Sequence, residues 1–415
     1  MAEYRFGEGT KLLMSNGSSK AVESIRKGDV LLAEDGDVTQ VTKVFTGEDT
    51  MYKIIPQSVS SEPYIISGHS IINLRYNTKP RITKAVDGGY VRYRVKYMHS
   101  FIDKRGLVKI KEKQENFSAN KCGSIEQALT EAEKFRDALV EKFEKEYPIH
   151  EATVEEYLSQ AKSVNHRLVG YYVGLDFRFT FEVDLDPYFL GIWLGDGTSV
   201  STQITNIDEE VIAFIHEYAE KFPDIKVRRG KITEHNKGYD YSLSGPGKGK
   251  NPILTMMKKY NILNNKHIPV EYLFSSKDNR MQLLAGLIDS DGYLANGTYY
   301  EITQKRKEIS EGIMFLARSL GFWCHNVERE TYCIYQGEKK WGVYQNTTIG
   351  GDGIEGIPIK VKRKKCSYGD RLYNQVNHKI KIQSLGQQKY YGFELSRNVS
   401  VLNDSFIVMG KYVGN

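Results

Sequence analysis

Two carboxylates stand at matching places in a motif that occurs twice in this chain. The copies, Tyr188–Gly197 and Met281–Tyr293, each predict a short apolar helix that contains small residues and ends in an acid. Those acids are Asp196 and Asp291, which lie 95 positions apart. Small residues such as Gly191 let two helices approach closely, so side-by-side packing of the copies would bring the two carboxylates to one point.

Paired carboxylates of this kind suit a divalent cation. Two bare carboxylates a few Å apart repel each other, and a shared Mg²⁺ removes that repulsion. Mg²⁺ prefers oxygen ligands and keeps several waters, one of which can act as a nucleophile, so metal-assisted hydrolysis of a phosphodiester fits the motif. A single Asp-Gly pair would indicate only a helix end. The second copy, with a matching apolar run before it, favours the metal site.

The elements that follow each motif come in the same order. After Asp196 the pattern predicts a strand at 203–205, a helix at 208–221, strands at 225–232 and 239–243, and a helix at 252–260. After Asp291 it predicts a strand at 300–303, a helix at 307–320 and strand-rich sequence to about 350. This internal repeat predicts two related subdomains about a pseudo-twofold axis, with the motif helices at the axis.

The flanking segments differ from this α/β pattern. The first 75 residues show short apolar alternations separated by Gly and Asp turns, which predicts a compact all-β unit. Residues 81–113 indicate irregular strands and basic loops, followed by helices at 125–145 and 153–160; the apolar stripe of the first helix starts at Ile125. From Lys379 the sequence returns to β character. This last stretch either completes the N-terminal unit or forms a separate small domain.

Composition and charge narrow the class of protein. A chain of 415 residues with 40% hydrophobic and 27% charged residues is typical of a soluble globular protein with two or three domains. Neither a membrane-spanning run nor a signal peptide is present, which favours an intracellular protein, and the four cysteines lack zinc-site spacing. The net charge is +6, and three basic runs in the half that carries the paired acids favour a polyanion partner. The candidate DNA-binding residues in these runs are Arg228, Arg229, Lys231, Lys305, Arg306, Lys307, Lys360, Lys362 and Arg363.

The second motif copy, Leu284–Gly292, resembles the LAGLIDADG motif of homing endonucleases, and Leu190–Gly197 resembles the variant first copy found in intein-encoded members. The resemblance implies an α+β domain of two αββαββα-type repeats in which Asp196 and Asp291 bind Mg²⁺, with Mn²⁺ as a substitute. It also implies a catalytic lysine near each acid. Lys266 resembles the first of these catalytic lysines; the alternative interpretation is that Lys266 is an exposed cation in a loop. Lys364 is the candidate for the second, and Lys362 is the nearest alternative.

The two ends of the chain resemble the halves of a Hint (intein-like) splicing domain. The matching segments are 9–14, 22–25, 28–29 and 51–52 near the N-terminus, and 391–395 and 401–408 near the C-terminus. The resemblance implies an all-β Hint domain formed by residues 1–182 and 379–415, with a DNA-contact insertion at about 76–150. The endonuclease domain would occupy 183–378, with repeats at 183–279 and 280–378. This order resembles that of intein endonucleases and mating-type switching endonucleases.

The positions that perform splicing are degenerate. Splicing starts with an acyl shift at a Cys or Ser. When residues 6–10 are aligned with the start of a splicing domain, Arg5 takes this position, and a guanidinium cannot form a thioester. Splicing ends at an Asn, usually after His, and the alignment places Gly410 and Lys411 there, or Gly414-Asn415 when counted from the chain end. His69 matches the activating histidine. We therefore expect a Hint fold without splicing, through natural loss or through engineering.

The sequence predicts a site-specific endonuclease that cuts both strands of a long, asymmetric duplex DNA site, acts as a monomer and has no membrane association. We expect it in the nucleus, or in the cytoplasm of a prokaryotic or viral host, wherever the host DNA resides. Two alternatives stay open: an intein whose terminal residues are altered, and a LAGLIDADG protein that binds DNA or RNA without cleaving it.

Overall fold

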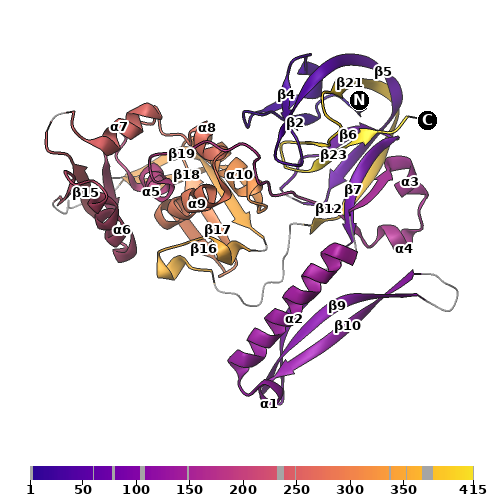
Figure 1. Ribbon diagram of the computed structural model, residues 1–415, viewed down its shortest axis with the longest axis horizontal. Helices are drawn as coiled ribbons and strands as arrows, with labels where there is room; N and C mark the ends of the chain where they lie inside the picture. The colour runs from indigo at the N-terminus through magenta and orange to yellow at the C-terminus, as the bar shows by residue number, and fades with distance from the viewer. Residues whose placement is uncertain are drawn as a thin grey trace. The chain divides into compact units, whose positions relative to one another are not determined.

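The computed structural model describes residues 3–58, 60–76, 80–102, 108–146, 149–230, 238–247, 249–335, 338–351, 353–366 and 377–414. The chain divides into two compact units, one comprising residues 1–71 with most of 171–415, the other comprising residues 72–170 (Figure 1). In these described ranges, no helix is both long enough and apolar enough to cross a membrane.

The two ends of the chain build one antiparallel sheet in the first unit. The long strand β5 (Val38–Pro56) pairs with β21 (Ile380–Leu395), which also pairs with β1 (Glu3–Phe6). Strand β23 (Val408–Tyr412) pairs with β1, and β4 (Val30–Leu32) pairs with the start of β5. The C-terminal stretch therefore completes the N-terminal β unit, and the alternative of a separate C-terminal domain is wrong.

Apolar side chains on alternate positions give this sheet its core. Tyr4 and Phe6 of β1 are buried and stack on Phe393 of β21, with ring centroids 5.3 and 5.6 Å apart. Strand residues alternate between faces, so these rings lie on one side of the sheet. The remaining short elements here are β2 (Lys11–Leu13), β3 (Ser19–Ala21), η1 (Val22–Ser24), β6 (Tyr64–Ser67), β20 (Asn377–His378) and β22 (Val401–Leu402).

The second unit contains a regular three-stranded sheet. Its strands β8 (Arg81–Asp87), β9 (Tyr90–Ile102) and β10 (Val108–Ser118) pair in the order β10-β9-β8. The expectation of irregular strands and loops is therefore wrong for the described residues 81–102 and 108–113, and residues 103–107 lie outside the described ranges. The other elements of this unit are β7 (Ser70–Tyr76), α1 (Ala119–Cys122), α2 (Ile125–Glu146), β11 (His150–Thr153), α3 (Val154–Ser159), α4 (Lys162–Asn165) and β12 (Leu168–Tyr171).

Helix α2 covers one face of this three-stranded sheet. Val95 of β9 is fully buried, and Tyr97 contacts Phe135 of α2 with ring centroids 5.8 Å apart. The helix begins where the sequence predicts, because the backbone N–H of Gln127 donates to Ser124 Oγ. Ile125 is 41% exposed, so the prediction that the packed stripe starts there is wrong: this residue lies in the first turn, off the packed face.

The repeated motif lies in the first unit, within a lobe of helices and two small sheets. The first repeat contains α5 (Pro187–Asp196), β13 (Gln203–Asn206), α6 (Glu209–Glu220), β14 (Lys226–Arg229), β15 (Tyr239–Ser244) and α7 (Pro252–Lys259). After α8 (Val270–Leu273), the second contains α9 (Lys277–Asp291), β16 (Gly292–Ala295), β17 (Tyr299–Gln304), α10 (Lys307–Ser319), β18 (Trp323–Tyr335) and β19 (Glu338–Gly350). The sheet orders are β13-β15-β14 and β16-β17-β19-β18.

Each repeat lacks one element of the αββαββα pattern: the first repeat lacks the first strand, and the second lacks the last helix. The first strand of the first repeat is reduced to one isolated bridge between Gly197 and Ile204. The second repeat closes with two single 3₁₀ turns, η2 (Ile354–Gly356) and η3 (Lys362–Lys364), where the first has helix α7. The boundaries 183–279 and 280–378 stay predictions, because both repeats belong to one compact unit with the terminal sheet.

Local signals fix where α5 and α9 begin. Asp186 accepts hydrogen bonds from the backbone N–H groups of Tyr188 and Phe189, and Pro187 occupies the first turn of α5. Ser276 caps α9 in the same way, by accepting from the N–H of Asn279. Both helices therefore start at defined residues, and this defines the position of each terminal acid along its helix axis.

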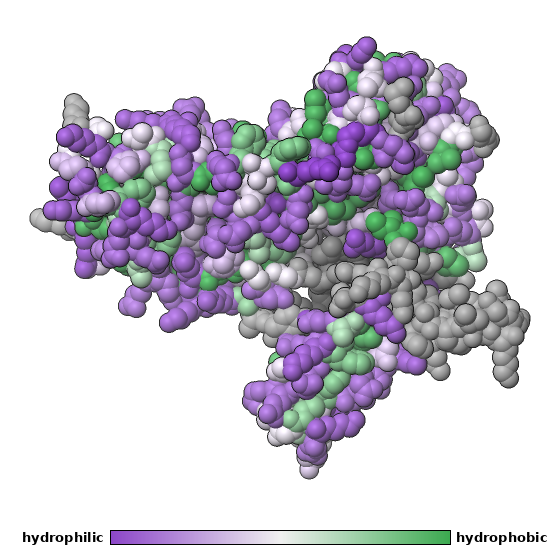
Figure 2. Space-filling view, viewed as in Figure 1, coloured by the Kyte–Doolittle hydropathy of each residue, from purple (hydrophilic) through white to green (hydrophobic). Residues whose placement is uncertain are grey.

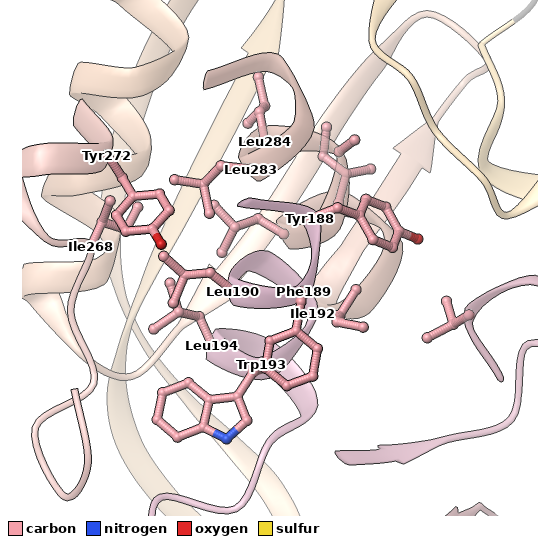
Figure 3. Packing of buried hydrophobic residues seen from close by; sticks show 14 of the residues in the cluster. Tyr188, Phe189, Leu190, Ile192, Trp193, Leu194, Ile268, Tyr272, Leu283 and Leu284 are labelled. Carbon is pink, nitrogen blue, oxygen red and sulfur yellow. The ribbon is translucent and has the colours of Figure 1, made fainter. Parts of the chain in front are cut away.

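Helix α5 and the Leu283–Ile288 part of α9 are apolar on all sides because they form the centre of the lobe. Leu190, Trp193 and Leu194 of α5 pack with Leu283 and Leu284 of α9, and all five are almost completely buried (Figure 3). A helix that is hydrophobic all round is one that other elements surround. The core thus holds the apolar parts of both helices, and each apolar run is followed by its acid at the C-terminal end.

Candidate active site

Helices α5 and α9 cross at glycines, and this crossing brings their C-terminal acids together. A Cβ atom on Gly191 would lie 2.8 Å from the Cα atom of Gly286, so the two backbones are in direct contact. Closer to the helix ends, a Cβ atom on Gly195 would lie 3.0 Å from Oδ2 of Asp291. Because Gly195 immediately precedes Asp196, the two predicted carboxylates lie beside each other at one end of the pair.

Burial and mutual repulsion change the acidity of this pair. Burial raises the pKa of Asp196 to about 7, and the charge of Asp291 adds to the shift. Burial also raises the pKa of Asp291, against the opposing effects of a hydrogen bond from Gln304 and the nearby lysines. Ionisation of both carboxyls is therefore unfavourable in the folded protein, and a bound cation would reduce the repulsion between them.

The two predicted lysines lie in equivalent places, each against the end of one motif helix. Nζ of Lys266 donates to the carbonyl oxygens of Leu194 and Gly197, at 3.0 and 2.6 Å. Nζ of Lys364 donates to the carbonyl oxygens of residues 288–290, at 2.8–2.9 Å. A cation there satisfies the free carbonyl groups of a helix C-terminus and interacts favourably with the helix dipole.

The burial of Lys266 and Lys364 decides between the interpretations that the sequence left open. Lys266 is 8% exposed, so its interpretation as an exposed loop cation is wrong, and burial lowers its pKa to about 8. Lys364 is 4% exposed and burial lowers its pKa too, whereas the alternative Lys362 is exposed. The negative charges of Asp196 and Asp291 act on Lys266 in the opposite sense and favour its protonated form.

Two amide side chains complete the site, and the sequence analysis missed both. Nδ2 of Asn206 donates to Oδ2 of Asp196 at 2.7 Å, and Nε2 of Gln304 donates to Oδ2 of Asp291 at 2.5 Å. Asn206 ends β13 and Gln304 ends β17, the strands that follow the two motifs. A signal was present: the strands end in Ile-Thr-Asn and Ile-Thr-Gln.

The residues at this site fit a hard divalent cation. The described ranges contain no cluster of three or more His, Cys, Asp and Glu side chains placed to hold a metal. A cation here would take oxygen atoms from Asp196 and Asp291 and fill its other positions with water or phosphate oxygens, as Mg²⁺ characteristically does. The raised pKa values of both carboxyls agree with such a site, because a cation removes the repulsion between them.

The predicted DNA-binding residues fall into two groups. Arg228, Arg229, Lys305, Arg306 and Lys362 are exposed, and Figure 2 shows hydrophilic residues over most of the visible face of this lobe. Lys307 is also exposed, and it forms an i,i+4 ion pair with Glu311 at 3.8 Å. Lys231 lies outside the described residues.

Two members of the C-terminal basic run have partners within the protein. The Lys360 ammonium lies over the rings of Tyr188 and Phe214, at 5.0 and 5.2 Å from their centroids. The Arg363 guanidinium makes two hydrogen bonds to the carboxylate of Asp208, at 2.8 and 3.1 Å. Binding of a phosphate by either residue would compete with these contacts, and the same holds for Arg229, whose guanidinium lies 3.5 Å from the ring centroid of Tyr239.

The degenerate splicing positions come together around the paired strands β1 and β23, in the middle of the terminal sheet. Arg5 forms ion pairs with Glu3 and Asp49, and its guanidinium lies 3.5 Å from the ring centroid of Tyr412. His69 contacts the same ring edge-on, with centroids 6.1 Å apart. Gly410 and Lys411 precede Tyr412 on β23. A bulky cation with its own acid partners thus occupies the place where the alignment requires a nucleophile.

Comparison with protein-family models matches residues 5–409 to the family described as Hom_end-associated Hint. The replicative DNA helicase DnaB of Mycobacterium intracellulare is 33% identical over 143 residues, which cover 34% of this chain and 20% of that protein. The homothallic switching endonuclease of Saccharomyces cerevisiae is 23% identical over 375 residues, which cover 76% of this chain and 62% of that protein. The chain thus spans less than two thirds of either relative.

Among solved structures, the gp41-1 intein matches with 16% identity over 28% of this chain and 88% of its own, at a TM-score of 0.15. A variant of the same intein matches with 17% identity, 28% and 87% coverage and a TM-score of 0.14. Scores this low carry no weight for the arrangement of this chain.

Proposed function

This chain belongs to the Hom_end-associated Hint family, and from that membership we propose that it is a LAGLIDADG homing endonuclease that makes a site-specific double-strand cut in DNA. The observation that carries the proposal is the paired site at the ends of α5 and α9. Asp196 and Asp291 meet there, each beside a buried lysine and an amide side chain. The similarity to a switching endonuclease supports the same activity.

The residues of the site divide the chemistry between them. Asp196 and Asp291 would hold Mg²⁺, or Mn²⁺ in its place, which when bound supplies Lewis acidity and a water of lowered pKa. Lys266 and Lys364 would orient that water or stabilise the negative charge that develops on the phosphate. Asn206 and Gln304 fix the carboxylates by donating to them, which leaves the remaining carboxylate lone pairs for the metal.

Two small sheets supply surfaces for reading DNA. Strands β14 and β15 belong to the first repeat and β18 and β19 to the second, so each half of a long asymmetric site would have its own sheet in the major groove. Exposed cations such as Arg228 and Arg306 would contact phosphates and make binding sensitive to salt. A single chain with two unlike sheets would act on such a site as a monomer, in whichever compartment holds the DNA.

The second unit offers a further surface for DNA. Because Val95 and Tyr97 face α2, alternation along β9 turns Arg94 and Lys96 to the uncovered face of that sheet. Nε of Arg94 donates to Oδ1 of Asn116 on the neighbouring strand, which orders the arginine. We propose that this face adds phosphate contacts.

We further propose that the Hint domain has lost splicing. Arg5 stands at the first residue that the family model matches, and its ion pairs with Glu3 and Asp49 occupy the position of the nucleophile. The intact mass of the purified protein, followed for several days with and without added thiol, should stay constant. A shortened or joined product would contradict this proposal and favour the intein alternative.

The test of the endonuclease begins with binding, because the target site is unidentified. Asp291→Asn, which should bind but not cut, is used in Ca²⁺ to select duplexes from a randomised library. Those duplexes are then incubated with the unaltered protein in Mg²⁺. We expect cleavage of both strands at one position, and none with Asp196→Asn or Asp291→Asn. The matched control is Asp278→Asn, an exposed acid in the first turn of α9, which should cleave normally.

The outcomes separate the competing functions. Selected duplexes that the protein binds and leaves intact in both Mg²⁺ and Mn²⁺ would contradict the endonuclease and favour a non-cleaving DNA-binding protein. Cleavage by Asp291→Asn at the rate of the unaltered protein would remove the paired-carboxylate argument, even if the protein were a nuclease.

A further inference from the structure

One fully buried acid next to the site has no part in the chemistry proposed above. Asp289 is 0% exposed and lies in the last turn of α9, two positions before Asp291. Its Oδ2 accepts a hydrogen bond from the Tyr188 hydroxyl and another from the backbone N–H of Lys360, both at 2.7 Å. Its Oδ1 accepts from the N–H of Val361 at 3.3 Å. A buried carboxylate needs such donors, and all of these are neutral.

The backbone that Asp289 holds is the segment that carries Lys364. Val361 is the residue before the 3₁₀ turn η3, and the N–H of Lys364 donates to the Val361 carbonyl at 2.9 Å. The Lys364 ammonium then returns to α9, where it donates to the main-chain carbonyl of Asp289 itself at 2.8 Å. Asp289 thus contacts both ends of one short loop, with its side chain at the start and its carbonyl at the lysine.

The first repeat holds its lysine by other means. The position equivalent to Asp289, two before the motif acid, is Leu194, which has no polar side chain. Lys266 instead lies 4.9 Å from the ring centroid of Trp193, and its loop is joined by a hydrogen bond from the N–H of Asn264 to the carbonyl of Ser199. The two lysines therefore reach equivalent places through unlike supports.

We propose that Asp289 is a positioning residue that fixes Lys364 through the backbone of residues 360–361, so that cleavage of one DNA strand depends on it and cleavage of the other does not. This inference rests on the proposed endonuclease activity. A geometric shift of about 1 Å at a reacting centre can slow a reaction on the order of 100-fold. Loss of the tether should therefore slow one cut strongly and change the order in which the strands are cut.

The substitution Asp289→Asn tests the tether with the smallest change in shape. The carboxylate accepts from three donors, whereas a carboxamide presents an NH₂ group to at least one of them and loses that contact. Tyr188→Phe removes one donor and keeps the ring, so it gives a second, milder variant should Asp289→Asn fold poorly. The destabilisation control is Ile313→Ala, a fully buried residue of α10 in the same repeat.

The experiment measures the two strand cuts separately, on a selected duplex labelled at either 5′ end, under single-turnover conditions. Lys364→Met first identifies the strand that depends on this lysine. We expect Asp289→Asn to slow that same strand at least tenfold relative to the other, and Tyr188→Phe to shift the ratio in the same direction by less. Ile313→Ala should leave the ratio unchanged, because loss of folded protein affects both cuts equally. Equal slowing of both strands by Asp289→Asn would overturn the proposal.

Backbone hydrogen exchange tests the tether without DNA. In Asp289→Asn, the amides of residues 360–361 should exchange at least tenfold faster than in the unaltered protein, whereas those of residues 262–266 should keep their rates. Unchanged exchange at 360–361 would overturn the tether even if the protein is a nuclease. If the unaltered protein cuts no duplex, the endonuclease and the strand asymmetry fail together, and the exchange result alone decides the tether.

Discussion

The backbone contact between α5 and α9 sets the distance between the two carboxylates, and Gly191→Ala perturbs that contact directly. A Cβ atom on Gly191 would lie 2.5 Å from the carbonyl oxygen of Leu283 and 2.8 Å from both the Cα of Gly286 and the N of Leu287. All three are backbone atoms, so no side chain can rotate away. Restoring ordinary contact distances of about 3.5 Å requires the helices to separate by roughly 0.7–1 Å.

This separation has a calculable effect on stability and on activity. Overpacking in a core costs about 1–3 kcal/mol, and the higher helix propensity of alanine offsets about 1 kcal/mol of it. We therefore expect Gly191→Ala to lower the free energy of unfolding by up to about 2 kcal/mol. Cleavage should fall by much more, on the order of 100-fold, because the carboxylates at the helix ends move apart by a comparable distance.

The assay compares Gly191→Ala with Gly356→Ala, which makes the same chemical change where a Cβ atom meets nothing within 4 Å. Urea unfolding gives stability, a gel-shift titration gives affinity for the selected duplex, and single-turnover cleavage gives the rate. We expect near-normal affinity for both variants and a large loss of rate only for Gly191→Ala. Equal cleavage rates in the two variants would refute the view that this crossing sets the spacing of the acids.

Three further predictions concern single ionisable groups. Since the pKa of Asp196 is raised to about 7, its ionisation opposes folding increasingly as pH rises from about 4 to 7. Asp196→Asn should therefore melt at the same temperature as the parent near pH 4 and at a higher one at pH 8, by calorimetry in chelator. Lys266→Met should slow cleavage on the order of 100-fold with duplex affinity, measured by gel shift, within twofold. Burial lowers the pKa of His378 to about 4, so protonation of this one residue should contribute a loss of about 3 kcal/mol of stability as the pH falls from about 6.5 to 4. Urea unfolding of His378→Phe should lack this loss.

The helices of the site could be predicted from sequence because their signals are local. The apolar run of α5, its Asp186 cap and its terminal acid lie within a dozen consecutive residues. In α9 the Ser276 cap, the apolar run and the terminal acid lie within sixteen consecutive residues. Lys266 and Lys364 came from the resemblance to a family, since nothing near either lysine in the sequence indicates that it is buried. Their burial follows from contacts with carbonyl groups more than 60 positions away.

Other features depend on partners that sequence spacing does not reveal. The basic run at 360–365 predicted DNA contacts, yet Arg363 pairs with Asp208, 155 positions earlier. Asn206 and Gln304 were missed although both end strands with matching sequences, because an amide at a strand end is common and only its distance to an acid distinguishes it. The regular pairing of β8, β9 and β10 was also missed, since residues 81–113 suggested irregular strands and basic loops.

The pairing of β5 with β21 has a consequence for synthesis of the protein. Ile380 pairs with Pro56, so more than 300 residues must be added after β5 before β21 exists, although β4 and β6 can pair with β5 earlier. At about 5–20 residues per second, this takes roughly 15–60 s. Every strand between residues 183 and 366 pairs with another strand in that range. The lobe of the two repeats can therefore fold on the ribosome before β21 is available to pair with β5. An unpaired strand edge invites pairing with other chains. Conditions that slow translation between these strands should therefore increase aggregation of the nascent protein.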